Sequence, residues 1–269
     1  DFSDIDAIHI RCLATNLPVA VPPVLNAASH AEWRGYYLRE QEYQAVMASF
    51  FSRLEAAGKL IVNLPTGGYL DHDSKAQFYQ KLRALGFAAP QTLMTNDPER
   101  ASAFLDRVGA AVVKPSVGVG STRRVTESDL DRLDEFRVCP VLLQEFLSGD
   151  TIRVHIVGDC VVLALRILAD RGVEVDSRVG TQGFEYFKLP DHEEQRIVQA
   201  TRSLGLHYAA WDILATDDGR YVYLDCNPGP YIMWIGEENT QFVLRQLAHY
   251  MLAYARSHSL EEAADQVKA

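Results

Sequence analysis

The sequence predicts an α+β protein, and three observations support that fold class. Apolar residues recur at helical spacing in several segments, of which 38–58 is the longest. Short apolar runs typical of strands separate these segments, and strands dominate from about residue 141 onward. The chain has 269 residues and is 48% hydrophobic, enough for one large domain or for two or three smaller interlocked ones.

The first unit is expected over 1–68. An alternating segment at 5–13 predicts a strand, and 38–58 predicts a helix that ends at Gly58. The apolar run 60–63 predicts a short buried strand. This strand–helix–strand order is typical of part of an α/β domain, and Pro65 with the following glycines marks a soft boundary.

A second unit is expected over 69–147 and a third over 148–269. The second alternates helices at 74–85, 98–108 and 129–136 with strands at 91–95, 110–115 and 141–147. The third contains two predicted hairpins, one turning at Gly158-Asp159 and one at 217–219. Helices are expected at 191–204 and 239–256.

The overall charge and the cysteines exclude several classes of protein. A net charge of −10 without a basic stripe argues against general nucleic-acid binding, although local cations suffice for a nucleotide. Neither an apolar run of membrane-spanning length nor a signal segment is found, so a cytoplasmic protein is expected. The chain begins at Asp1, which leaves open whether residues precede it. Buried free thiols are expected at four positions: Cys12, Cys139, Cys160 and Cys226.

A glycine-rich loop at 114–121 (KPSVGVGS) follows the strand at 110–115. Gly118 and Gly120 permit a backbone that can turn amide groups toward phosphate oxygens, and Lys114 would supply charge. The loop is not a P-loop, because no GK[ST] follows, and Arg123 replaces the third glycine of a dinucleotide fingerprint. The alternative is a flexible hairpin without a ligand.

Two carboxylates and an amide are predicted to converge on the second hairpin. Strand alternation places Asp225 and Asn227 on one face, together with Tyr221 and Tyr223. Folding about 217–219 brings Asp212 opposite residue 224 or 225. Such hard oxygen ligands suit Mg²⁺ held with substrate phosphates. The alternative is a set of solvent-facing acids on an edge hairpin.

Other candidate contacts lie on neighbouring strands. The segment 144–146 (QEF) ends an apolar strand, where backbone groups can bind adenine or simply close the strand. Three arginines are flanked by apolar or small residues: Arg153, Arg166 and Arg178. Their guanidinium groups suit carboxylate or phosphate, although each can also be a surface charge. Because Arg153 and Arg166 fall on adjacent strands of one hairpin, we expect them to act together.

The order of these pieces resembles the ATP-grasp superfamily, particularly the branch of the ribosomal S6 glutamate ligase and the graspetide macrocyclases of microviridin type. The resemblance covers about 65–260, and its matching segments are 73–92, 112–121, 141–147, 152–159, 209–214 and 223–230. It implies an ATP-grasp fold, in which two α+β subdomains sandwich ATP. It also implies a partial pre-ATP-grasp domain at 5–63.

The resemblance also implies roles for individual residues. Lys75 and Lys114 would contact phosphate, and Arg153 would meet the γ-phosphate and the acyl phosphate. The Mg²⁺ ligands would be Asp212, Asp225 and Asn227, with Mn²⁺ as an alternative ion. Further nucleotide or catalytic contacts would be Gly118, Gly120, Ser121, Gln144, Glu145, Phe146, Asp150 and Arg166. Departures from the family pattern are Thr151 in place of an acid, Asp225 in place of Glu, and no Arg-x-Asn run near Arg178.

The activity implied is ATP-dependent joining of a carboxylate to an amine through an acyl phosphate. A peptide or an amino acid is the expected substrate, with peptide macrocyclisation as one form of this chemistry. The aromatic run with Tyr231, Met233 and Trp234 is either a peptide-facing wall or core packing. Alternatives are a non-catalytic ATP- or peptide-binding module and an ATP-grasp kinase. A homodimer is compatible with this organisation.

Overall fold

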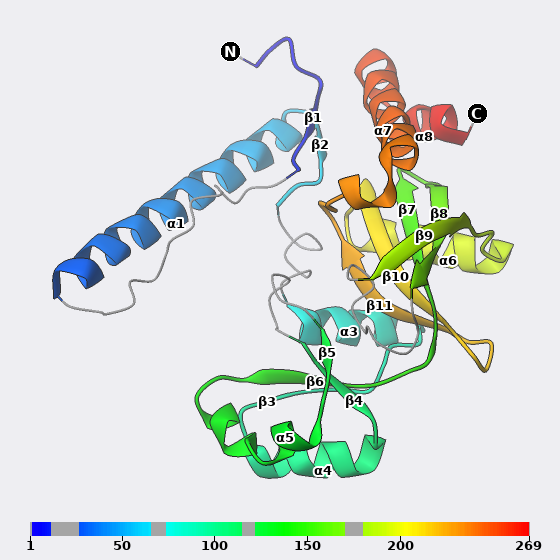
Figure 1. The fold of residues 1–269 in the computed structure, drawn as a ribbon. Coiled ribbons are helices and arrows are strands. Elements are labelled where there is room, and N and C mark those ends of the chain that lie inside the picture. Colours follow the sequence, from blue (N-terminus) through cyan, green and yellow to red (C-terminus); the bar gives the residue numbers. More distant parts are fainter. Residues whose placement is uncertain (1, 12–26, 66–73, 115–121, 170–179, 269) are drawn as a thin grey trace.

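The computed structural model describes residues 2–11, 27–65, 74–114, 122–169 and 180–268, which form three sheets with helices around them (Figure 1). A parallel pair joins β1 (Ala7–His9) to β2 (Leu60–Val62). A four-stranded sheet has the order β3-β6-β4-β5, and a five-stranded sheet has the order β11-β10-β7-β8-β9. Helices mixed with separate sheets confirm the α+β prediction.

The N-terminal unit combines the parallel pair with one long helix. Helix α1 (Ala27–Ala56) begins well before the predicted 38–58 and extends away from the rest of the molecule (Figure 1). Its last turns pack Phe51 against Ile10 and Ile61. Strand β1 is shorter than the predicted 5–13, and the final two positions of that segment lie outside the described residues.

The middle unit follows the predicted alternation except at 129–136, where the short helices α5 and η1 replace the single predicted helix. Asp97 caps α4 because its carboxylate accepts bonds from the N–H groups of Glu99 and Arg100. Phe104 of α4 and Leu143 of the central strand share one small core beneath the four-stranded sheet. The elements are α3 (Lys75–Ala84), β3 (Thr92–Thr95), α4 (Pro98–Val108), β4 (Ala111–Lys114), β5 (Arg123–Arg124), α5 (Glu127–Leu130), η1 (Leu133–Arg137) and β6 (Val141–Glu145).

The C-terminal unit is built on the five-stranded antiparallel sheet, and both predicted hairpins are confirmed. Strand β9 and helix α8 were not predicted. The elements are β7 (Gly149–Val157), β8 (Cys160–Ala169), β9 (Thr181–Tyr186), α6 (Asp191–Ser203), β10 (Tyr208–Thr216), β11 (Tyr221–Asn227), η2 (Met233–Ile235), α7 (Glu237–Ser257) and α8 (Leu260–Lys268).

Each face of this sheet is covered by different elements. On one face, α3 and α6 pack over a core that includes Ile152 and Trp211. On the other face, β2, α7 and α8 pack over a core that includes Val157, Leu165 and Tyr208. Helix α3 therefore joins the middle unit to the C-terminal sheet, and the N-terminal strand pair closes the opposite face.

A β-bulge on β11 changes which side chains share a face. Asp225 lies opposite Asp212, whereas Tyr223 lies opposite Ile213, so Leu224 is the extra residue. Tyr223 consequently joins the core beneath α3 and α6, and Asp225 points to the other face. The predicted common face for Tyr223 and Asp225 is wrong, because one inserted residue reverses the alternation.

Three of the cysteines are free thiols with different exposure. Cys226 is buried as predicted, Cys160 is half-buried and Cys139 is exposed, while Cys12 lies outside the described residues. Burial of all four is therefore wrong at Cys139. Among the helices that the structure describes, none has both the length and the apolar character that crossing a bilayer requires.

Candidate active site

Three adjacent strands place charged side chains in one row on the face closed by the N-terminal strands. Asp225 of β11 lies opposite Asp212 of β10, and Asp212 lies opposite Arg153 of β7. Arg153 Nη1 donates to both carboxylate oxygens of Asp212, each at 2.8 Å. The predicted hairpin register is thereby confirmed, with residue 225 as the partner of Asp212.

Asn227 extends this row along β11. It lies two residues beyond Asp225, hence on the same face, and its strand partner is Ala210. Alanine occupies little space between Asn227 and His155, the residues opposite it on the two neighbouring strands. Two carboxylates and one amide therefore present oxygen atoms within one small region of the sheet.

This donor set fits a hard divalent cation better than a soft one. Carboxylate and amide oxygens are ligands typical of Mg²⁺. Across the described ranges, no cluster of three or more His, Cys, Asp or Glu side chains offers another metal site. Asp212 and Asp225 each keep 23% of their side chain exposed, so both remain accessible to a ligand.

Lys75 reaches the same carboxylates from another element. It is the first residue of α3, and its buried ammonium contacts Asp225 Oδ1, which also accepts the Cys226 N–H at 2.9 Å. Tyr79 anchors the helix by donating to the Leu224 carbonyl at 2.8 Å. Burial raises the pKa of Tyr79 to about 12, so this phenol stays protonated as a donor.

Arg153 lies deep in the site, with only 4% of its surface exposed. Its guanidinium lies 5.7 Å from the centre of the Trp234 ring, and its Nε has no partner within the described residues. A buried unpaired donor is costly, so a ligand acceptor here would stabilise the site. A bound phosphate could accept a hydrogen bond from this Nε. Its cation could bind the oxygen atoms of Asp212, Asp225 and Asn227.

Two side chains near Arg153 on this face, those of His155 and Tyr208, are uncharged. Burial lowers the pKa of His155 well below its ordinary value, and the nearby Arg153 charge lowers it further. Burial likewise raises the pKa of Tyr208, whose hydroxyl lies 3.4 Å from His155 Nδ1. The guanidinium of Arg153 therefore lies beside uncharged side chains and bonds the carboxylate of Asp212.

The predicted phosphate loop is described only at its edges. Lys114 is the last residue of β4, where its backbone lies opposite Leu142. Gly118, Gly120 and Ser121 lie outside the described residues. Beyond the loop, Arg124 of β5 places its guanidinium 3.8 Å from the centre of the Phe146 ring. This contact fixes the C-terminal end of the loop to the predicted adenine segment.

The segment 144–146 is already bonded within the protein. The Glu145 carboxylate accepts from the Gln91 N–H and Nε2, at 2.8 and 2.9 Å. The backbone N–H groups of Glu145 and Phe146 donate to the carbonyls of Gln91 and Ala110. Buried Gln144 donates to Thr92. The next amide, that of Leu147, has no partner in the part of the chain that is described.

Arg166 and Asp150 form a separate pair on the opposite face. Arg166 lies opposite Ile152 in the strand register, whereas Arg153 lies opposite Leu165. Its Nε is 3.3 Å from Asp150 Oδ2, its Nη1 is 3.2 Å from Glu185, and it covers the Phe187 ring. The expected joint action of Arg153 and Arg166 is wrong, because adjacent positions of paired strands point to opposite faces. Arg178 lies outside the described residues.

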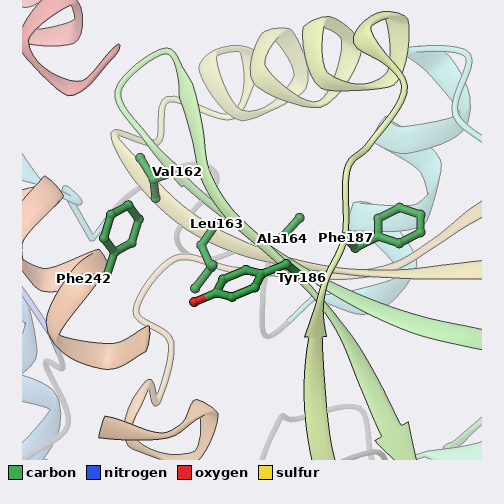
Figure 2. A pocket seen from close by; sticks show the side chains of 6 residues that line it. All are labelled: Val162, Leu163, Ala164, Tyr186, Phe187 and Phe242. Atoms are coloured by element: carbon green, nitrogen blue, oxygen red, sulfur yellow. The ribbon is translucent and has the colours of Figure 1, made fainter. Parts of the chain in front are cut away.

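A shallow apolar pocket lies between β8, β9 and α7, away from the charged row (Figure 2). Its volume of about 210 Å³ is below the range usual for small-molecule sites. Among its lining residues, Tyr186 and Phe242 are exposed and Leu163 is buried (Figure 2). Nothing in its lining replaces the charged row as the candidate active site.

Sequence patterns did not identify several contacts of this site. Trp234 and Arg124 are single residues whose partners lie far along the chain, so no local spacing marks them. Tyr231 and Met233 are exposed, while Trp234 packs partly into the core, so core packing is confirmed for Trp234 and the peptide-facing wall stays a prediction. His155 lies two residues after Arg153 on β7, so strand alternation could have predicted that both side chains lie on the same face.

Comparison with known proteins places the charged row inside a recognised domain. A family model described as an ATP-grasp domain matches residues 72–230. Probable alpha-L-glutamate ligase 2 of Shewanella amazonensis is 29% identical over 202 residues, which cover 67% of this chain and 65% of that protein. Ribosomal protein bS6–L-glutamate ligase of Escherichia fergusonii is 28% identical, covering 70% of this chain and 65% of its own. The chain thus spans 65% of the length of both curated relatives.

Solved structures show the same architecture. The ATP-grasp ligase PsnB, complexed with a minimal precursor, is 31% identical with a TM-score of 0.70, covering 85% of this chain and 72% of its own. The macrocyclase MdnC of Microcystis aeruginosa, bound to its precursor peptide, has a TM-score of 0.67 at 21% identity, covering 88% and 76%, and it shares the fold. The family match spans more than half of the chain and includes the row formed by Asp225, Asp212 and Arg153. This chain therefore belongs to the ATP-grasp family.

Proposed function

We propose that this chain is a ligase that uses ATP to join a carboxylate to an amine through an acyl phosphate. The observation that supports this most directly is the row of Asp225, Asp212 and Arg153, with Lys75 reaching into it. Within an ATP-grasp chain, this arrangement is suited to a triphosphate and its cation. No nucleophilic side chain is required, because ATP itself activates the carboxylate.

The reaction balances in two steps. A carboxylate oxygen attacks the γ-phosphorus and ADP leaves; the amine then attacks the acyl carbon, inorganic phosphate leaves and the amine loses a proton. Asp212, Asp225 and Asn227 would hold Mg²⁺, which neutralises phosphate charge when bound. Arg153 and Lys75 would bind phosphoryl oxygens, and Arg153 would stabilise the charge of the tetrahedral intermediate.

Adenine recognition would fall to the segment after β6. The N–H groups of Glu145 and Phe146 are used by protein carbonyls. The Leu147 N–H, which bonds no other described residue, would then donate to an adenine nitrogen. The contact between Arg124 and Phe146 joins β5 to this segment. Lys114, at the start of the glycine-rich loop, would contact phosphate.

A peptide is the substrate that we favour. PsnB, at 31% identity, was solved with its precursor, and MdnC was solved with a precursor peptide. In this chain Tyr231 and Met233 are exposed beside Trp234, which contacts Arg153. An exposed aromatic surface next to the reacting groups can contact several side chains of a peptide, whereas a free amino acid offers only one. Peptide macrocyclisation is the form of ligation that these observations favour.

The activity is tested by ADP release. Purified protein is assayed with ATP, Mg²⁺ and panels of amino acids and of acidic, Lys-containing and Thr-containing peptides. Mass spectrometry should show the loss of one water for each bond formed within a peptide. A stable phosphorylated product without amine consumption would instead identify a kinase, and no ADP with any candidate would favour a non-catalytic binding module.

Site variants connect this activity to the charged row. Asp225→Ala and Lys114→Ala should each abolish ADP release without unfolding the protein, as checked by circular dichroism. Asp218→Ala is a matched control, because Asp218 is an exposed carboxylate on the turn of the same hairpin. Full activity in either site variant would defeat the assignment.

A further inference from the structure

The side chain of Asn63 joins the N-terminal unit to the predicted metal site. Asn63 follows β2 directly and is completely buried, with 0% exposure. Its Nδ2 donates to the carbonyls of Tyr208 and Pro228 at 2.5 and 2.6 Å. Its Oδ1 accepts the N–H groups of His207 and Tyr208 at 2.7 and 3.1 Å. All four bonds cross more than 140 positions of sequence.

These four bonds connect Asn63 to the ends of β10 and β11, the two strands that carry the predicted metal ligands Asp212 and Asp225. Tyr208 is the first residue of β10, and Pro228 follows the last residue of β11. The register pairs Ala210 with Asn227 just inside this end of the hairpin. The side chain of Asn63 therefore closes the open end of the hairpin, at the point where Asn227 leaves the sheet.

Asparagine is the residue type that this position needs. Its amide offers two donors and two acceptor lone pairs on one short side chain, and all of them are used here. Aspartate has no donor when ionised, and a leucine of similar size would leave two carbonyls and two N–H groups unbonded. The geometry is thus specific for the amide and not only for its volume.

We propose that Asn63 is a positioning residue for the metal site, acting through the Pro228 backbone to fix the Asn227 side chain. The proposal rests on the proposed function, since Asn227 is a metal ligand only in that function. The N-terminal strand pair, which lies before the matched domain, would then contribute directly to how tightly the site holds its cation. Outer contacts that orient ligands typically change metal affinity by about 10- to 100-fold.

Mn²⁺ binding to the ADP-saturated protein tests this without turnover. Free Mn²⁺ is followed by electron paramagnetic resonance, and ADP binding without metal is measured separately. Asn63→Ala should weaken Mn²⁺ binding about tenfold or more, while metal-free ADP binding stays close to that of the wild type. Should Asn63→Ala fail to fold, Asn63→Ser carries the test with the same criterion, because its hydroxyl can serve only one of the two carbonyls.

Thr201→Val is the matched control, because it also removes a buried side-chain hydrogen bond. Thr201 is fully buried on the opposite side of β10, where its hydroxyl accepts the Trp211 Nε1–H at 2.9 Å. This variant should lose stability and keep wild-type Mn²⁺ affinity. Unchanged Mn²⁺ affinity in the Asn63 variant, or an equal loss in Thr201→Val, would overturn the positioning role alone. A wild-type protein that binds no Mn²⁺ with ADP would instead overturn the proposed function.

Discussion

At the scale of single residues, Asp212 and Arg153 depend on each other. Arg153 is almost fully buried, and its Nη1 donates to both carboxylate oxygens of Asp212. Asp212→Ala would leave a buried guanidinium without its counter-charge, which typically costs about 3 kcal/mol or more. We expect urea unfolding to show a loss of about that size, together with the loss of ADP release.

The matching conservative change separates stability from metal binding. Asp212→Asn keeps one oxygen acceptor for Arg153 and should be less destabilised than Asp212→Ala, while activity is still lost. Equal stability of Asp212→Ala and the wild type would contradict the buried pair. The place of Asp212 could be predicted because pairing within a hairpin is local. Its pairing with Arg153 could not, because that depends on the register between β7 and β10.

Arg124 provides a second prediction at this scale. Its guanidinium covers the Phe146 ring at 3.8 Å, and such a contact contributes roughly 0.5–1 kcal/mol at an exposed position. Arg124→Ala should therefore raise the KM for ATP about two- to fivefold and leave kcat largely unchanged. The control is Arg107→Ala, which removes a similar contact with Phe104 on α4. Equal KM values for both variants would refute a role in ATP binding.

At the scale of elements, α1 is packed at one end and exposed along most of its length. Phe51 is buried against β2, whereas Tyr43, two turns earlier, is exposed. Phe51→Ala should lower the free energy of unfolding by about 3 kcal/mol, and Tyr43→Ala should change it by less than about 0.5 kcal/mol. Differential scanning calorimetry or denaturant unfolding measures both. A similar loss in both variants would show that the exposed turns contribute to the stability of this chain.

The elements also show where sequence patterns succeed. Helix α4 has the predicted bounds, 98–108, because Pro98 in its first turn marks where it starts. Strand β11 was located correctly, but the bulge at Leu224 reversed the side on which Tyr223 points. A bulge adds one residue without changing composition, so the period of two cannot reveal it. The start of α1 was missed because its first half has no core-facing stripe.

At the scale of the whole molecule, one buried and two half-buried histidines make stability depend on pH. Burial lowers the pKa of His9, His155 and His207 in the folded protein. Unfolded histidine titrates near 6.5, so the unfolded chain binds more protons below that pH. The free energy of unfolding should therefore be maintained above about pH 6.5 and decline as the pH falls below it.

Denaturant unfolding at pH 7.5 and pH 5.5 measures this effect before most carboxylates titrate. A fully buried histidine contributes about 1.4 kcal/mol in total between these two pH values. His155→Gln should show a shallower decline than the wild type. His192→Gln is the control, because His192 is exposed on α6 and should leave the slope unchanged. An identical slope in all three proteins would exclude His155 as a source.

Much of the whole fold could be predicted because its parts are local. The two hairpins, the middle helices and the pairing of Asp212 with Asp225 follow from spacing along adjacent segments. The contacts of Lys75 and Asn63 could not be predicted from spacing, since their partners lie 150 and 145 positions away. Arg153 and Arg166 were separated only by the strand register, which composition does not encode.

The cluster formed by Asp212, Asp225, Lys75 and Arg153 has one more consequence. Two acidic and two basic side chains neutralise one another, so a lone divalent ion would meet little attraction there and would compete with an ammonium group already in place. An incoming triphosphate brings its own negative charge, to which the lysine and the arginine can turn. Cation and nucleotide should consequently bind together, and either one alone should be held weakly.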